Sequence, residues 1–130
     1  MTTVYCRPTT ANYFRFEKLE VWQLAREFVG EIYGITRKFP KDEIFGLISQ
    51  LRRAATSILL NIAEGSDRKS DIDFRRFLRM SLTSLEEVIS GLYISLDQNF
   101  INQKDFEKLY EDAQRLAAKL NALIRSLNKR

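Results

Sequence analysis

The chain has 130 residues, a formal net charge of +4, a single cysteine and no histidine. This length fits one domain with a substantial core, and the lone cysteine excludes an internal disulfide and suits a reducing cytoplasm. No stretch approaches the ~18 consecutive apolar residues of a spanning helix, and the lack of histidine removes the commonest general base and zinc ligand. The composition therefore predicts no membrane span, no metal site and no cofactor.

A first helix is expected over residues 17–38, after a short tail. Residues 1–15 contain no continuous apolar segment, so we interpret them as a flexible tail rather than a secretory signal, and assign the bundle domain to residues 16–130. Phe39-Pro40 ends the helix, because the residue before proline is driven out of the helical region. The predicted inward seam follows helical spacing: Trp22, Ala25, Val29, Ile32 and Thr36.

A second helix is predicted to begin between residues 41 and 45 and to reach Glu64. Gly65 is expected to end it in the left-handed conformation, which a residue without Cβ adopts at no steric cost. An apolar stripe repeats along the helix at steps of three and four: Leu47, Leu51, Ala54, Ile58 and Ile62. A second, mostly polar stripe has the same spacing: Gln50, Arg53, Ser57, Leu60 and Glu64.

Two further helices complete the predicted fold. Ser70, with Asp73 three residues later, is the expected N-cap of a third helix reaching about residue 98, and Asn102 is the expected N-cap of a fourth. The third helix carries two adjacent seams, the first being Phe74, Leu78, Ser81, Leu85, Val88 and Leu92, and the second Phe77, Met80, Ser84, Glu87, Gly91 and Ile94. The fourth repeats Phe106, Leu109, Ala113, Leu116, Leu120 and Leu127. Because all connections are short, the sequence predicts an all-α, antiparallel up-down-up-down four-helix bundle.

Polar residues of the second and third helices are predicted to meet in register. In an antiparallel hairpin, residues at equal height have numbers with a constant sum, and four pairs give 140 or 141: Arg53 with Glu87, Glu64 with Arg76, Ser57 with Ser84, and Gln50 with Gly91. We expect the first two to be ion pairs. The predicted structural polar network consists of Gln50, Arg53, Ser57, Asn61, Glu64, Ser84 and Glu87.

This network is interpreted as structural, because buried polar residues can fix register and partner choice. The alternative is a catalytic site. An arginine–glutamate pair beside two hydroxyls offers no nucleophile–base arrangement, so we assign no catalytic residue.

Basic residues are predicted to gather at one pole of the bundle. The chain start, the turn between the second and third helices, and the chain end share this pole, with ten basic residues against six acidic ones. The opposite pole has five basic residues against seven acidic ones. The candidates for nucleic-acid contact are Arg68, Lys69, Arg75, Arg76 and Arg79. The alternative is that these side chains are merely solvated, and that basic residues near the chain end complement a helix dipole.

Four segments carry a resemblance to a known family: Phe16-x-x-Leu19-x-Val21-Trp22, Phe39-Pro40, the run from Leu47 to Gly65, and Ser84-Leu85-x-Glu87. They resemble the four helix bundle protein family, whose best-known members are encoded in intervening sequences of 23S rRNA genes and are often mislabelled as ribosomal proteins. One departure is Thr83, where the family pattern has glycine. The resemblance implies a homopentamer, and similarity to accessory proteins of diversity-generating retroelements, which are thought to bind nucleic acid and a reverse transcriptase.

Apolar residues in excess of what one bundle core needs indicate a subunit interface. They include the second seam of the third helix and one side of the first helix, namely Val21, Leu24, Phe28 and Ile35. The sequence therefore predicts a non-enzymatic, cytoplasmic homo-oligomer that binds RNA or DNA non-specifically through a basic end or ring face. The alternative is a structural or protein-interaction oligomer, docking onto a partner such as a reverse transcriptase, with no nucleic-acid ligand.

Overall fold

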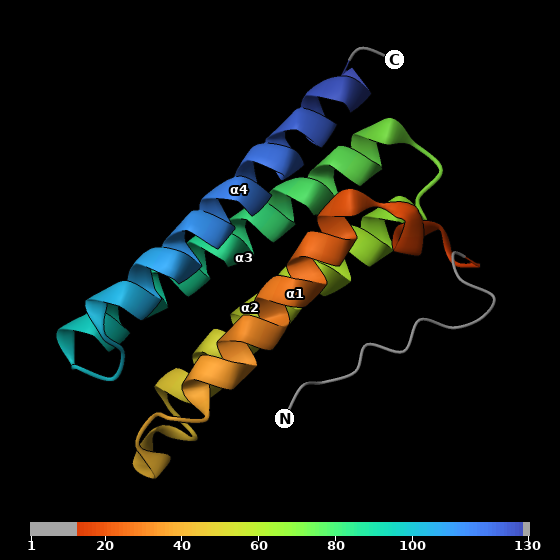
Figure 1. Ribbon diagram of the computed structural model, residues 1–130. Helices are drawn as coiled ribbons and strands as arrows, with labels where there is room; N and C mark the ends of the chain where they lie inside the picture. Colours follow the sequence, from red (N-terminus) through yellow and green to blue (C-terminus); the bar gives the residue numbers. More distant parts are fainter. Residues whose placement is uncertain (1–12, 129–130) are drawn as a thin grey trace.

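The computed structural model describes residues 13–128, most of which lie in four long helices. Their bounds are α1 (Glu20–Thr36), α2 (Leu47–Ser66), α3 (Asp71–Asp97) and α4 (Gln103–Asn128), with short 3₁₀ helices η1 (Arg15–Lys18) and η2 (Lys41–Glu43). Successive helices run antiparallel, so the start of α1, the α2–α3 turn and the end of α4 share one pole (Figure 1). The predicted all-α bundle is confirmed. Between residues 13 and 128 there is no strand, and no helix is long and apolar enough to cross a membrane.

The first two helices begin later than the sequence predicted. Residues 15–18 form η1, so α1 starts at Glu20, and most of the predicted tail lies outside the described residues. The α1–α2 connection contains η2 and Gly46, and α2 starts only at Leu47. The carboxylate of Glu43 accepts a hydrogen bond from the Leu47 amide at 3.2 Å, which satisfies one free amide of the first turn. This side chain therefore fixes the start of α2 from within the connection.

Gly65 lies inside α2, and the prediction that it ends the helix in the left-handed conformation is wrong. No glycine between residues 13 and 128 has a positive φ. The helix continues to Ser66, whose hydroxyl donates to the Ala63 carbonyl at 2.8 Å. In the described chain, the left-handed conformation occurs at Asn99, with φ 63°, just after α3. Asparagine tolerates this region better than most residues, which allows the chain to turn between α3 and α4.

Side-chain caps open α3 and α4 as predicted. Ser70 Oγ accepts a hydrogen bond from the Asp73 amide at 3.1 Å, and Asn102 Oδ1 accepts one from the Asp105 amide at 2.7 Å. Each cap satisfies an amide that a helix N-terminus otherwise leaves without a partner. Local sequence therefore determines where both helices begin.

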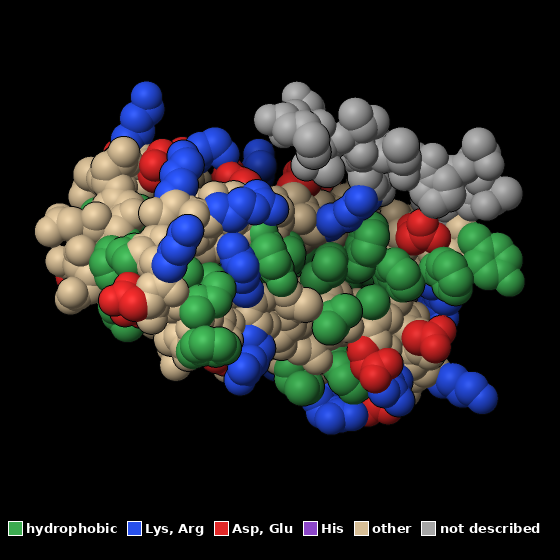
Figure 2. Space-filling model, turned by 90° about the horizontal axis from the view of Figure 1, so that it is seen from below, with side chains coloured by type: hydrophobic (Ala, Val, Ile, Leu, Met, Phe, Trp, Pro, Cys, Tyr) green, Lys and Arg blue, Asp and Glu red, His purple; other side chains and the backbone are tan. Residues whose placement is uncertain are grey.

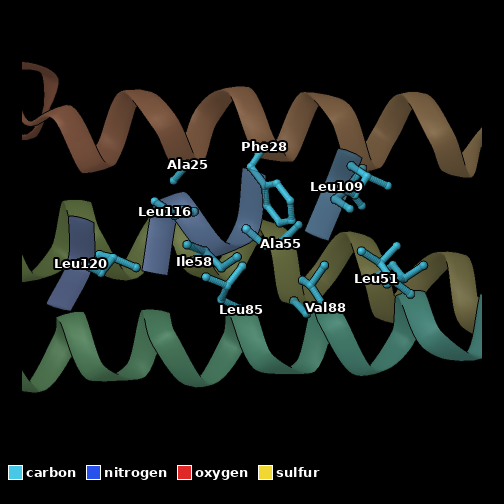
Figure 3. Packing of buried hydrophobic residues seen from close by; sticks show 14 of the residues in the cluster. Ala25, Phe28, Leu51, Ala55, Ile58, Leu85, Val88, Leu109, Leu116 and Leu120 are labelled. Carbon is cyan, nitrogen blue, oxygen red and sulfur yellow. The ribbon is translucent and has the colours of Figure 1, made fainter. Parts of the chain in front are cut away.

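All four helices contribute to one hydrophobic core (Figure 3). The predicted apolar stripe of α2 is buried throughout, and so is the predicted stripe of α4. The first seam of α3 is buried from Leu78 to Leu92, and only Phe74 at its start is half-buried. Figure 3 shows Phe28 of α1 and Leu116 of α4 in the same cluster as Ile58 of α2.

The inward face of α1 differs from the predicted seam. Its buried residues are Val21, Ala25, Phe28, Ile32 and Thr36. Trp22 and Val29, which the prediction placed in the seam, are only half-buried. Because α1 is apolar over much of its circumference, periodicity alone did not separate two neighbouring stripes. Val21 and Phe28, expected at a subunit interface, therefore belong to the core of the bundle.

Small residues bring α2 and α3 into close contact. A Cβ added to Gly91 would lie 2.6 Å from Leu51 Cδ2, and one added to Gly65 would lie 2.7 Å from Phe77 Cβ. Between these points, the Ser81 hydroxyl donates to the Ile58 carbonyl at 2.9 Å. The absence of a side chain at Gly65 is thus required by helix packing and not by a turn.

Ion pairs bridge α1 and α4 at the surface. Lys108 Nζ lies 2.8 Å from Glu31 Oε2 and 2.9 Å from Asp112 Oδ2, and Lys119 Nζ lies 3.4 Å from Glu20 Oε1. Burial raises the pKa of Glu31. Desolvation also acts to raise the pKa of Asp112, but its hydrogen bonds with Glu31 and Lys108 outweigh this effect, so the pKa of Asp112 is lowered. Hydrogen bonds to both carboxylates raise the pKa of Lys108. One ammonium group therefore holds two carboxylates together.

Gly65→Ala is expected to destabilise the protein by roughly 1–3 kcal/mol, because the Phe77 Cβ atom cannot move without its backbone. Gly91→Ala should cost less, since the obstructing atom is the end of a leucine side chain. Gly30→Ala is the control: no atom lies within 4 Å of an added Cβ there, and alanine's helix propensity predicts a gain of about 0.5–1 kcal/mol. Urea denaturation measures all three, and equal effects at Gly65 and Gly30 would contradict the close approach.

Lys108→Met is expected to lower the free energy of unfolding at pH 7, because Glu31 loses its ammonium partner and then faces Asp112, whose remaining cation is Arg115 at 3.8 Å. The deficit should shrink as the pH falls below 7, because Lys108 acts to lower the pKa of Glu31 and its removal raises that pKa further. Glu31 then takes up its proton more readily in the folded variant than in the folded unmodified protein, which relieves the repulsion from Asp112. Lys104→Met is the control, because Lys104 forms no ion pair within residues 13–128. Thermal denaturation across this pH range checks the prediction, and a pH-independent deficit refutes it.

Candidate functional site

A groove follows the outer side of the α2–α3 pair. Its volume is about 680 Å³, and both Gly91 and Leu51 lie along it. Five residues of the predicted polar network also line it: Gln50, Arg53, Ser57, Ser84 and Glu87. The close approach of the two helices therefore places polar side chains of both along one surface depression.

The structure brings three members of the predicted network into direct contact. The Ser84 hydroxyl donates to Ser57 Oγ at 2.9 Å, and Asn61 Nδ2 donates to the same oxygen at 3.1 Å and to the Ser57 carbonyl at 2.9 Å. Ser84 is buried, and Ser57 and Asn61 are half-buried. The predicted equal height of Ser57 and Ser84 is thus confirmed by a hydrogen bond between helices.

The two predicted ion pairs do not form. Arg53 and Glu87 are both exposed and line the same groove, but no ion pair within 4.0 Å joins them. Glu64 instead pairs with Arg68 at 3.3 Å. Arg76 pairs with Asp73, at 3.6 Å, on its own helix. Long, exposed side chains gain little from a partner across the helix pair, and partners three or four residues away need less ordering.

The groove is lined by polar side chains, several of which already have hydrogen-bond partners. The Ser57 and Ser84 hydroxyls bond to each other, and the Thr83 hydroxyl donates to the Arg79 carbonyl at 3.2 Å. In the part of the chain that the structure describes, no group of histidine, cysteine or acidic side chains could hold a metal ion. The remaining polar side chains of the groove, Gln50 and Ser90 among them, can form hydrogen bonds with a partner.

Two candidate arginines of the basic pole are held against one aromatic ring. The guanidinium carbons of Arg68 and Arg76 lie 4.8 Å and 4.9 Å from the ring centroid of Phe77. These cation–π contacts keep both charged groups at the surface. Phe77 was predicted to lie in an apolar seam. Its contact with Arg68 could not be predicted from the sequence, because Arg68 lies in the α2–α3 turn and its approach to the ring depends on the fold.

The other three candidate residues for nucleic-acid contact, Arg75, Lys69 and Arg79, differ in whether their charged groups have a partner. Arg75 Nη1 donates to the Leu127 carbonyl at 3.1 Å, so it caps the end of α4. Lys69 and Arg79 are exposed and form no ion pair within residues 13–128. Only these two of the five candidates therefore have a charged group without a partner in the described chain.

The basic excess of this pole is smaller in the described chain than in the full count. Arg7, Lys129 and Arg130 lie outside the described residues, which leaves seven of the ten counted basic residues beside all six acidic ones. Toward the right of Figure 2, the side of the α2–α3 turn, basic and acidic side chains lie intermixed. Ion pairing within the pole therefore offsets much of its positive charge.

Comparisons with known proteins agree with the resemblance seen in the motifs. Residues 17–122 match the family described as 23S rRNA-intervening sequence protein. The chain is also similar to a crystal structure from Bacteroides thetaiotaomicron, a protein with unknown function from the S23 ribosomal protein family. The two are 24% identical with a TM-score of 0.74 over 80% of this chain and 97% of that one, which shows a common fold. A comparison with curated proteins gives no match. Because the family match runs from the start of α1 far into α4, this chain belongs to the 23S rRNA-intervening sequence protein family.

Proposed function

We propose that the protein is a non-enzymatic helical module that assembles into a homo-oligomer and binds RNA or DNA non-specifically through its basic pole. Exposed apolar side chains on α2 and α3 are the observation that carries self-association: Ile94 lines the groove, and Leu60 and Met80 lie on the same helical stripes as Ser57 and Ser84. Leu60, Met80 and Ile94 are 60%, 43% and 50% exposed. Apolar residues that border a groove on a small monomer are typical of protein interfaces. A second copy of the chain, as the family resemblance implies, would cover them.

The basic pole supports the nucleic-acid part of the proposal. Lys69 and Arg79 are free of ion pairs within residues 13–128, and the side chain of Arg76 is 61% exposed. Exposed ion pairs are weak, so a phosphate chain can replace the carboxylate partners of Arg68 and Arg76. Assembly around a symmetry axis would repeat this pole in every subunit. The combined charge would then attract nucleic acid by counterion release, without reading its sequence.

The second candidate function is a protein-interaction oligomer without a nucleic-acid ligand. The ion pairs of Arg68 and Arg76, and the carbonyl contact of Arg75, favour it, because each engages a candidate residue within the monomer. In that case the α2–α3 groove would receive a protein partner, such as the reverse transcriptase that the resemblance suggests. Salt-dependent binding to RNA separates the two candidates.

Ile94→Glu is expected to lower the mass of the assembly in solution, because it places a charge on the proposed apolar interface. Tyr93→Glu is the matched control: Tyr93 is the adjacent residue with a similar exposure of 48%, but its ring packs 4.8 Å from that of Phe106 on the α4 side. Light scattering coupled to size-exclusion chromatography gives the masses. Equal masses for Ile94→Glu and the unmodified protein would exclude this face as the interface.

Arg79→Glu is expected to weaken binding to a generic single-stranded RNA several-fold and to make the dependence of log K on log salt shallower by about one unit. Lys104→Glu is the control, since it reverses one exposed charge on α4 at the opposite pole. Fluorescence anisotropy at several salt concentrations measures both. No binding of the unmodified protein at low salt would favour the protein-interaction alternative, and equal losses for both variants would exclude a localised basic site.

A further inference from the structure

A second cluster of basic side chains lies at the opposite pole, where the sequence places five basic residues against seven acidic ones. A notch of about 300 Å³ opens between the end of α1, the α1–α2 connection and the first turns of α2. Its lining includes three basic side chains, Arg37, Lys41 and Arg52. Figure 2 shows basic side chains toward the left of the view, the side of the α1–α2 connection, with hydrophobic and some acidic side chains among them.

Arg52 is held in a fixed position in this notch. Its Nε donates to Thr36 Oγ1 at 2.9 Å, and the buried Thr36 hydroxyl in turn donates to the Ile32 carbonyl at 2.7 Å. The guanidinium carbon lies 4.7 Å from the ring centroid of Tyr33. One hydrogen bond and one ring contact therefore orient the planar group, and they leave its two terminal nitrogens available.

None of these three basic side chains has a carboxylate partner within 4.0 Å in the described part of the chain. The nearest acidic residues in sequence do not supply one: the carboxylate of Glu43 accepts the Leu47 amide and caps α2, and Asp42 is exposed. The basic pole at the other end differs, because Arg68 and Arg76 both form ion pairs there. The notch thus keeps its positive charge within the monomer.

The shape and lining of the notch restrict what it can hold. Its remaining walls include the apolar side chains of Phe39, Ile44 and Ile48. A half-buried guanidinium beside two exposed cations suits a compact polyvalent anion, since arginine forms paired hydrogen bonds with phosphate oxygens. The apolar walls suit the organic part of an ester next to that anion. Arg37 directly follows α1, so its position can be explained by a favourable interaction with the helix dipole. This explanation does not apply to Arg52, which lies within α2.

We propose that the notch between α1 and α2 is a binding site for a phosphate ester, with Arg52 as the oriented ligand and Arg37 and Lys41 as supporting charges. The inference goes beyond the proposed function, because the notch lies at the opposite pole from the candidate residues of the basic pole. Two sources share this chemistry: the backbone of a nucleic acid and a small phosphorylated molecule.

The test is a titration of the ¹⁵N-labelled full chain with inorganic phosphate, against chloride at matched ionic strength. We expect saturable shifts of amide signals over residues 36–52. Arg52→Gln, and separately the exposed double change Arg37→Gln with Lys41→Gln, should weaken binding at least fivefold. The double variant keeps the test valid if Arg52→Gln disturbs the fold through Thr36.

Arg53→Gln is the matched control, because Arg53 is the next residue of α2, carries the same charge and lines the α2–α3 groove instead. Its affinity for phosphate should stay within twofold of the unmodified protein. Shifts that do not saturate, or an equal loss in Arg53→Gln, would overturn the proposal.

A short single-stranded oligonucleotide then identifies the source of the phosphate. Displacement of bound phosphate would indicate a nucleic-acid backbone, and a lack of competition would indicate a small phosphate ester; both results keep the site. Loss of RNA binding in Arg79→Glu reports on the basic pole alone, so failure of either proposal is distinguishable from failure of the other.

Discussion

The close packing of α2 against α3 is the constraint on which the rest of the structure depends. Gly65 and Gly91 remove the side chains that would hold the helices apart, and Ser57 and Ser84 join them between those points at 2.9 Å. A slip by one helical turn would push a larger side chain into each glycine contact and break this hydrogen bond. This single register places the outer groove, and it brings Phe77 within reach of both Arg68 and Arg76.

Much of this arrangement could be predicted from the sequence, because it rests on local rules and simple geometry. Helical spacing identified the buried stripes of α2 and α4, and the capping residues Ser70 and Asn102 fixed two helix starts. A constant sum of residue numbers correctly placed Ser57 opposite Ser84. These features depend on chain direction and period, which a sequence carries directly.

The features that could not be predicted depend on side-chain choice in three dimensions. A glycine at position 65 is compatible with two roles: it can end a helix, or it can let a neighbouring helix pack closely. Only the position of Phe77 in the folded structure distinguishes these two roles. Exposed Glu64 and Arg76 pair with residues three or four positions away and not across the groove. Arg53 and Glu87 form no ion pair within residues 13–128, so the expected pair between them was wrong. Counting charges by pole also missed the notch at Arg52, because a net count does not show which cations already have partners.

Nuclear Overhauser effects between assigned protons of α2 and α3 measure the register of the two helices. The account predicts contacts from the Gly91 Hα protons to the Leu51 methyl groups and from the Gly65 Hα protons to Phe77, observed together in one sample. Contacts displaced by three or four residues along either helix, or an absence of both in a folded protein, would contradict the proposed register.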